Sequence, residues 1–494
     1  MTSTRPSLSS TDPKQWRYIA EGGANVVLSY AGGAAGASSA FSGQLIRVRK
    51  RKLASTPSPV DLKNPVDLDT DNAVYEKVDS SEFAQSVIKP LLKSVTDRHS
   101  YSETASFLVD QEQVDIDQGW LQTLDEALKE SPLRPPERLG RDEVDDRCSQ
   151  VVICEDLIGG ENIVSVEIKP KWGFLPRPDH LSPATKATKT TFCRFCMHRY
   201  EKEAHKHPMQ ALDRHQTGYC PLDLFSQDHE RVQKGLRALW HGWEASHGSA
   251  NNLRLFVDGK RVEPHDDPGL ARLRTLLVSV KTHEAPQSTL DMFVSLLTPA
   301  LVDSGALVVL KFLQASLDHY DIEGLASIPQ LSLDDENSTA TIWSQPSIDE
   351  WKQWVERYLN RQEQQPKLQN IEDDPTHLRD VMLSYLMSAT FKDCSMILRF
   401  KFGPPVHNSS TNSLDQQEDS SQALPALNRR TSSLSTRTMQ AMPTVTVKLI
   451  DLDPKPLSKM KHWFELDQNI VESWQTMLDN HPLDGQGVRK CLDR

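Results

Sequence analysis

Two lysines held close together by a proline are the first feature of this sequence that could do chemistry, because paired ammonium groups bind anions. The stretch SVEIKPKWGFLP, residues 165–176, places Lys169 and Lys171 on either side of Pro170. The apolar residues before them recur at every second position, so Glu167, Lys169 and Lys171 are expected on the other face of a strand. Pro170 stiffens the link between the lysines. A solvated edge strand is the alternative, and it is favoured for the lysine pair taken alone.

Two carboxylates beside lysines form a second candidate site. In LIDLDPKPLSK, Asp451 and Asp453 stand two residues apart at the end of a strand-like run, and Lys455 and Lys459 follow where a helix is expected to begin. Mg²⁺ takes one or two carboxylates and leaves its other positions to phosphate oxygens and water. The pattern is therefore typical of a site that holds Mg²⁺ and phosphate together. For the string in isolation, a charged loop with surface ion pairs is the favoured interpretation.

A third signal is a group of cysteines and histidines within residues 193–220. A CxxC pair followed by His and Cys at this separation is the spacing of a closed structural Zn²⁺ site. The favoured ligands are Cys193, Cys196, His215 and Cys220, with His198 as the substitute for His215. The alternative is a group of reduced thiols that fills gaps in the core. The other cysteines are expected to be plain reduced thiols: Cys148, Cys154, Cys394 and Cys491.

Composition limits the class of protein. The chain has 494 residues, a formal net charge of -12, 37% hydrophobic residues and 30 prolines. This length suggests about two to three domain-sized units, or one bilobal unit with insertions. The acidic balance argues against general nucleic-acid binding but allows a local basic pocket. Because the sequence has no run of about 18 apolar residues and no signal-peptide core, we expect a soluble protein of the nucleus or cytoplasm without a membrane partner.

The hydrophobic pattern predicts strands at the start of the chain and helices in its middle. Residues 17–50 alternate apolar and polar around Gly-rich turns, which predicts a hairpin. Its EGGAN turn could bring backbone amides to a phosphate, although two adjacent glycines more often make only a turn. Residues 128–148 are polar and are interpreted as a linker or exposed loop. Helices are expected at 230–245, 289–298, 304–318, 349–362 and 376–390.

Two late strands, 395–402 and 444–452, are expected to form one hairpin. The residues between them, about 403–442, are rich in Ser, Thr, Asn and Gln and are expected to be a disordered insertion. An amphipathic helix should follow the second strand. A Gly-rich hairpin first, a lysine strand in the middle and an Asp-ended hairpin late are the order of parts in a bilobal phosphotransferase.

A set of motifs in this order resembles those of the inositol-pentakisphosphate 2-kinases. They are EGGAN, VEIKPKWGFL, CRFCMH, YCPLDLFS, NNLRLFVDG, KDCSMI and DLDPKPLSKM, and the resemblance spans about residues 16–475. EIKPK together with the downstream DLDxKP is highly specific, whereas EGGAN alone is not. The HRD and DFG signatures of protein kinases are absent from the sequence, as expected for a divergent small-molecule kinase.

The resemblance implies a reaction and an architecture. Family members use ATP and Mg²⁺ to phosphorylate the axial 2-hydroxyl of inositol 1,3,4,5,6-pentakisphosphate, which gives the hexakisphosphate, phytate. Five phosphates carry about -8 to -10 in total, which accounts for paired lysines. The implied fold is α+β and kinase-like. It has a flexible start (1–15), an N-lobe with an antiparallel sheet and a Gly-rich hairpin that binds nucleotide (16–165), and a larger, mostly helical C-lobe with the late hairpin and a zinc-braced loop (166–494).

The roles of family residues, carried over position by position, divide the candidates into two groups. Arg47 is implied as the N-lobe cation, because Gln44 stands near the place where kinases usually have a lysine. Lys459 stands where some members have Arg, which keeps the charge but loses the bidentate fork, and Trp463 replaces an aromatic hydroxyl. The implied nucleotide residues are Gly22, Gly23, Asn25, Arg47 and Glu167. The implied inositol phosphate residues are Lys169, Lys171, Lys189, Asn251, Arg254, Lys455, Lys459 and Trp463.

Catalysis is implied to depend on Asp451 as the Mg²⁺ ligand, with Asp453 beside it, and on Asp393 as the group that orients or deprotonates the attacking hydroxyl. The two roles could be exchanged, and Lys169 is implied to act at the transferring phosphate. A kinase for a less phosphorylated inositol and a non-catalytic inositol phosphate scaffold stay open as alternatives. The aspartates argue against the scaffold, since carboxylates do not help a pure anion binder. We expect a monomer whose partners are ATP and inositol pentakisphosphate.

Overall fold

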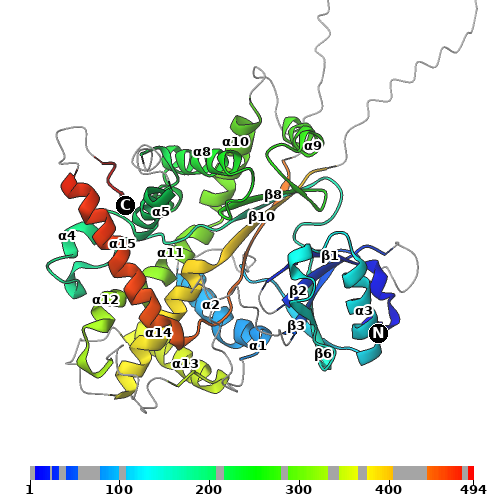
Figure 1. Cartoon of the computed structure of the whole chain (residues 1–494), viewed down its shortest axis with the longest axis horizontal. Helices are drawn as coiled ribbons and strands as arrows, with labels where there is room; N and C mark the ends of the chain where they lie inside the picture. Colours follow the sequence, from blue (N-terminus) through cyan, green and yellow to red (C-terminus); the bar gives the residue numbers. More distant parts are fainter. Residues whose placement is uncertain are drawn as a thin grey trace, which may run out of the picture.

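The structure is a computed structural model that describes residues 6–22, 25–32, 40–53, 78–98, 107–206, 216–279, 288–331, 344–364, 375–403, 442–480 and 488–493. In this part of the chain, two antiparallel sheets lie side by side and most helices surround the second one (Figure 1). Antiparallel sheets combined with many helices confirm the expected α+β class.

The first sheet is built from the N-terminal third of the chain. Its consecutive strands β1 to β3 are antiparallel neighbours, which confirms the hairpin expected at 17–50. Helix α3 (Gln118–Glu130) buries Leu121, Leu124 and Leu128 against it at helical spacing. Leu8, within the stretch 1–15, is buried in the same core. The strand order is β1 (Trp16–Glu21), β2 (Asn25–Tyr30), β3 (Gln44–Lys52), β6 (Gln150–Glu155) and β4 (Gln111–Asp115), with β5 (Asp142–Val144) paired to β3.

The polar segment 128–148 is not the open linker that its composition suggests. It contains β5, and both Arg134 and Asp142 are buried. Arg134 binds Glu21 of β1 at 3.2 Å, while Lys50 of β3 binds Glu21 at 2.8 Å and Asp142 at 3.1 Å. Because each buried charge has a partner of opposite sign, a polar sequence can be part of the interior here.

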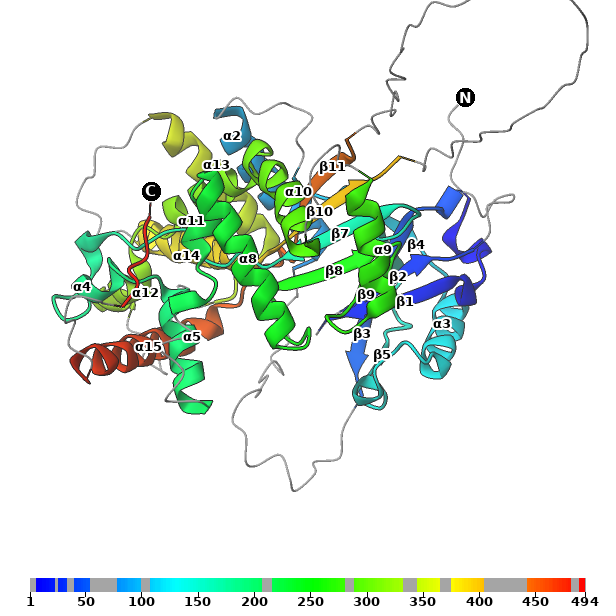
Figure 2. The ribbon, with the colours of Figure 1, turned by 90° about the horizontal axis from the view of Figure 1, so that it is seen from above.

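The second sheet carries the lysine strand in its centre. Its order is β11 (Thr444–Ile450), β10 (Ser395–Lys401), β7 (Ile163–Ile168), β8 (Leu253–Val257) and β9 (Lys260–Val262). Figure 2 shows β10, β7 and β8 side by side, between the helices and the first sheet. Every residue of β7 is buried, so both of its faces are covered. The predictions of a one-sided strand and of a solvated edge strand are therefore both wrong.

The late hairpin is confirmed, because β10 and β11 pair from Ser395 opposite Ile450 to Lys401 opposite Thr444. Residues 404–441, which include nearly all of the expected insertion, lie outside the described residues. The five expected helices and the amphipathic helix after the hairpin are also confirmed. The helices around this sheet are α4 (Lys186–Lys189), α5 (Arg194–Lys206), α7 (Pro221–Leu224), α8 (His229–Ala245), α9 (Asp267–Val278), α10 (Thr289–Asp303), α11 (Ala306–Leu317), α12 (Asp321–Ala326), α13 (Ile348–Gln364), α14 (Pro375–Asp393) and α15 (Met460–Asn480).

The larger hydrophobic core lies between the second sheet and these helices, and Trp243, Phe293 and Trp351 are fully buried in it. Helices α1 (Ser80–Phe83) and α2 (Lys89–Arg98), joined by a π-helical turn, pack into this core although they precede β4 in the chain. The segment that was expected to form the N-lobe therefore contributes two helices to the larger unit.

Among the described helices, none taken alone is both long and apolar enough to cross a membrane. The bent pair Thr289–Asp303 and Ala306–Ala326 meets those criteria of length and composition together. Its apolar side chains, such as Phe293 and Leu310, lie in the larger core.

Candidate active site

Two cavities are lined by β7 and the loop that follows it. The first, which we call the hairpin cavity, has a volume of about 900 Å³ and lies against β1, β2 and β3. The second, which we call the basic cavity, has a volume of about 1340 Å³ and lies against α5 and α8. Eight Lys or Arg and two Asp or Glu line the basic cavity, although the whole chain has a net charge of -12. The basic cavity is therefore a local site for an anion.

The lysine loop, residues 169–175, is held in place by side chains from other elements. Asn252 donates from its amide nitrogen to the carbonyl of Lys169 at 3.2 Å. The hydroxyl of Tyr219 donates to the carbonyl of Pro170 at 2.8 Å. Because the backbone on both sides of the proline is anchored, the first lysine leaves the strand in a fixed direction.

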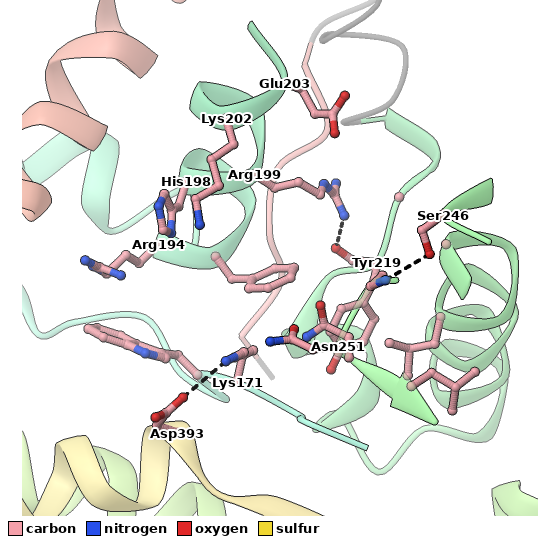
Figure 3. Close-up of a pocket in the computed structure, with 18 of the residues that line it drawn as sticks. Lys171, Arg194, His198, Arg199, Lys202, Glu203, Tyr219, Ser246, Asn251 and Asp393 are labelled. Atoms are coloured by element: carbon pink, nitrogen blue, oxygen red, sulfur yellow. Dashed lines mark hydrogen bonds and ion pairs between the residues drawn. The ribbon is translucent and has the colours of Figure 1, made fainter. Parts of the chain in front are cut away.

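Asp393, at the end of α14, pairs with two lysines in the basic cavity. Its carboxylate oxygens lie 3.3 Å from Lys171 Nζ and 2.8 Å from Lys455 Nζ, and Figure 3 shows the Lys171 pair. Partial desolvation raises the pKa of Asp393, but Lys455, Lys171 and Lys169 outweigh it and hold the pKa below its usual value. The group is therefore a carboxylate at neutral pH.

Asp451 leaves β11 with a left-handed backbone, φ 61°, which is rare for a residue other than glycine and typical of functional sites. Its Oδ2 lies 3.4 Å from Lys169 Nζ and 3.1 Å from the hydroxyl of Ser395, which also lies 3.0 Å from Glu167. A hydroxyl has a single proton, so Ser395 donates to one of these carboxylates at a time. Asp453 lines the hairpin cavity together with Asp451, and two carboxylates at one cavity are suitable ligands for Mg²⁺.

The residues expected at the nucleotide come together in the hairpin cavity. These are Gly22, Asn25, Arg47 and Glu167, while Gly23 lies outside the described residues. Arg254, expected at the inositol phosphate, lines this cavity as well and lies 3.3 Å from Glu167 on the neighbouring strand. The structure therefore places the charge of Arg254 beside the residues expected at the nucleotide.

Five of the eight residues expected at the inositol phosphate line the basic cavity. They come from the lysine loop, from the turn before β8 and from the chain around the start of α15, segments that adjoin β7, β8 and β11 of the second sheet. They are Lys171, Asn251, Lys455, Lys459 and Trp463.

Helix α5 supplies basic side chains that the sequence analysis missed. Arg194, His198, Lys202 and Lys206 follow one another at intervals of four residues and all line the basic cavity, and Figure 3 shows the first three on the same helix. Basic residues at this spacing lie on one face of a helix. The spacing therefore predicts a basic helix face, but the same stretch was interpreted only as a zinc site. Burial, together with Lys202, Arg194 and Lys171, lowers the pKa of His198 to about 3.

Lys189 is not a substrate cation in this structure, because it is buried among carboxylates. Its Nζ lies 2.5 Å from Asp321, 2.7 Å from Asp467 and 3.4 Å from Glu323, and its side chain is 3% exposed. Burial would lower its pKa, but the carboxylates outweigh burial and raise the pKa. Lys189 thus ties α4 to α12 and α15.

Four buried cysteines gather in the expected zinc loop. The sulfur atoms of Cys193, Cys196, Cys220 and Cys491 lie within 4.8 Å of one another. Cys491, expected to be a plain reduced thiol, is a free cysteine that joins this cluster, since residues 488–493 bring its Sγ to 3.8 Å from the Sγ of Cys220. His215 lies outside the described residues, and the substitute ligand His198 lines the basic cavity.

The cation-rich cavity, next to a second cavity bordered by two carboxylates, defines a phosphotransferase for a phosphorylated small molecule. The sequence profile of the family described as Inositol-pentakisphosphate 2-kinase matches residues 18–469. The chain belongs to this family, as the sequence motifs indicated. It is accordingly an ATP-dependent kinase that converts inositol pentakisphosphate into inositol hexakisphosphate.

Relatives described as inositol-pentakisphosphate 2-kinases match nearly the whole chain. The protein of Cryptococcus neoformans var. neoformans is 28% identical over 486 residues, which cover 95% of this chain and 97% of that one. The protein of Oryza sativa subsp. indica is 26% identical over 481 residues, 93% of each chain. The protein of Arabidopsis thaliana is 25% identical over 491 residues, 94% of each chain.

Lys189→Met should lower the free energy of unfolding by about 3–5 kcal/mol, because the buried Asp321 and Glu323 lose their cation and Asp467 keeps only Arg194. The KM for inositol pentakisphosphate should stay within about twofold in the folded fraction, since the lysine does not line the cavity. Urea unfolding and steady-state kinetics measure the two effects, with the exposed Lys186→Met on the same helix as the control. Unchanged stability with a large rise in KM would restore Lys189 as a substrate ligand.

Binding of a polyanion should raise the lowered pKa of His198, so this histidine should contribute proton uptake to the formation of the complex. Calorimetric titration with inositol pentakisphosphate, in buffers of different ionisation enthalpy, measures that uptake. His198→Asn should reduce it, whereas the exposed His229→Asn should not. Equal uptake by His198→Asn and the wild type would contradict the prediction.

Proposed function

We propose that ATP binds in the hairpin cavity, that inositol pentakisphosphate binds in the basic cavity, and that the phosphoryl group passes between them at the end of β7. The observation that carries this proposal is the two lysine–aspartate pairs, Lys169 with Asp451 and Lys171 with Asp393. Asp451 lines the hairpin cavity, and Lys171 and Asp393 line the basic cavity. Two separate sheets with the cavities beside them support a bilobal, kinase-like arrangement.

The basic cavity suits a substrate with several phosphates. The face of α5 supplies cations from one side, while Lys171, Lys455 and Lys459 supply them from elements distant in the sequence. A ligand with five phosphates carries about -8 to -10, and this group of cations can offset a large part of that charge. A less phosphorylated inositol would leave part of the cations without partners, so it would bind more weakly.

The hairpin cavity suits a nucleotide with its metal ion. Arg47 and Arg254 would bind phosphate oxygens, with Glu167 beside them. The carboxylates of Asp451 and Asp453 would hold Mg²⁺, which prefers oxygen ligands and, when bound, neutralises charge on the phosphates. Lys169, paired with Asp451, lies where its ammonium group could bind the transferring phosphate.

Asp393 would orient the attacking hydroxyl of the inositol. Its low pKa keeps it ionised, so it accepts a hydrogen bond from that hydroxyl. When substrate phosphates draw the ammonium groups of Lys171 and Lys455 away from it, its pKa must rise toward the usual value. Substrate binding therefore makes Asp393 a better proton acceptor at the moment when transfer begins.

We also propose that the four-cysteine cluster holds structural Zn²⁺. A tetrahedral site with Zn–S bonds of about 2.3 Å places sulfur atoms about 3.8 Å apart. The observed separations are 3.9 Å for Cys193 to Cys220 and 3.8 Å for Cys220 to Cys491. Burial, with the neighbouring thiols, raises the pKa of Cys193, so only a bound cation would stabilise its thiolate. Such a site would fix the start of α5, whose face lines the basic cavity.

Asp451→Asn and Asp393→Asn should each lower kcat by about two orders of magnitude or more, because positioning and charge neutralisation supply most of the rate of phosphoryl transfer. Both variants should still bind inositol pentakisphosphate. ADP release and phosphorus NMR of the product measure turnover, and calorimetry measures binding. The exposed Asp97→Asn is the control, and full turnover by Asp451→Asn would refute the proposed site.

Purified protein should contain one Zn²⁺ per chain, and Cys491→Ser should lose the metal and melt at a lower temperature because a ligand of a closed site is removed. Atomic emission and thermal unfolding measure these effects without reference to activity. Cys394→Ser, a buried thiol outside the cluster, should keep the metal. Full metal retention by Cys491→Ser would instead favour His215 or its substitute His198 as the fourth ligand.

A further inference from the structure

We propose that Gln314 is a positioning residue for phosphoryl transfer, because its side-chain amide sets the separation of Lys171 and Asp393. Gln314 lies on α11 and is 0% exposed, so it does not touch a ligand in either cavity. The inference rests on the roles proposed above for Lys171 and Asp393. Gln314 is a buried group that acts on both residues through their backbones.

The amide joins the two chain segments that carry the pair. Its nitrogen donates to the carbonyl oxygens of Lys171 at 3.0 Å and of Phe391 at 2.9 Å, and its oxygen accepts from the N–H of Gly173 at 2.8 Å. Both N–H groups and the oxygen are thus in use. Phe391 precedes Asp393 by two residues, so one planar group fixes the lysine loop against the end of α14.

The amide also holds the lysine in an unfavourable conformation. Lys171 has φ 65°, a left-handed backbone that is unfavourable for a residue other than glycine. Such a conformation persists only where the surroundings impose it, and here Gln314 binds the chain on both sides of Trp172. Lys392 also contacts Trp172, 3.9 Å from the ring centroid, but a cation–π contact is less directional than three hydrogen bonds.

The alternative is that Gln314 only satisfies polar groups in the core. A second contact between the same two helices separates the two interpretations. The hydroxyl of Ser388 on α14 donates to the backbone carbonyl of Gln314 at 2.7 Å, and Ser388 is also fully buried. Ser388→Ala removes a buried hydrogen bond between α11 and α14 but leaves the amide and the lysine loop unchanged, which makes it the matched control.

The test is steady-state kinetics of Gln314→Met, which removes the amide at nearly constant volume. Its kcat/KM for inositol pentakisphosphate should fall by about tenfold to a hundredfold, because small errors of placement are costly in transfer reactions. Its KM for ATP should stay within about twofold. Ser388→Ala should keep both parameters. A value of kcat/KM equal to that of Ser388→Ala would overturn the proposal.

A double variant tests whether the effect passes through the lysine. In a Lys171→Ala background, Gln314→Met should lower kcat/KM by a smaller factor than in the wild type, since no ammonium group is left to place and only Asp393 still depends on the amide. An undiminished loss in that background would assign Gln314 a general structural role. If Lys171→Ala and Asp393→Asn were themselves fully active, the proposed site would fail, which is a different outcome from failure of the positioning role.

Gln314→Glu gives a test that does not depend on the Met variant being folded. The ionised side chain would point an oxygen at two carbonyl oxygens, whereas the protonated acid can donate to one of them. Burial favours the neutral form, so activity relative to the wild type should rise as the pH falls from about 8 to about 6. A pH-independent ratio would contradict the role of the donated hydrogen bonds.

Discussion

Mutual repulsion among the cations of the basic cavity is the constraint on which the rest of the structure depends. Its effect is visible in Lys202, whose pKa is lowered by burial and by nearby cations such as Lys171 and Arg194. The fold opposes this repulsion by placing Asp393 between two of the lysines and by fixing the lysine loop through its backbone. Folding therefore supplies the free energy that is needed to bring these cations together. Less of the binding energy of the substrate is then needed to arrange the site.

The same constraint explains why the site-bearing segments leave rigid elements. The lysine loop follows β7, the central strand of the second sheet; Asp393 precedes its neighbour β10, and Asp451 follows β11, the strand beyond β10. Carboxylates within the interior, such as Asp321 and Asp467 around Lys189, tie helices to one another at a distance from the ligand. Charge is therefore used in two ways, for recognition inside the basic cavity and for packing outside it.

Local patterns in the sequence predicted the hairpins, the helices and the motifs that identify the family, because alternation and helical spacing depend only on near neighbours. They failed where a residue depends on distant partners. Lys189 is adjacent to a motif, but α12 and α15 supply the carboxylates that surround it. Cys491 is far from the other cysteines in sequence, and Arg254 is turned to the hairpin cavity by the pairing of β8 with β7. The four-residue spacing of the basic residues in α5 could have predicted its basic face, but the stretch was interpreted as a zinc site instead.

The register of the late hairpin has a consequence for engineering. Ser395 pairs with Ile450 at the active-site end, whereas Lys401 pairs with Thr444 at the opposite end, roughly 20 Å away for a strand of this length. The connection between Lys401 and Thr444 thus begins and ends far from the catalytic groups. Closure entropy grows slowly with loop length, by about 0.6 kcal/mol for each doubling. A fluorophore or an affinity tag could therefore be inserted at this connection at a small cost in stability and without displacing Asp451.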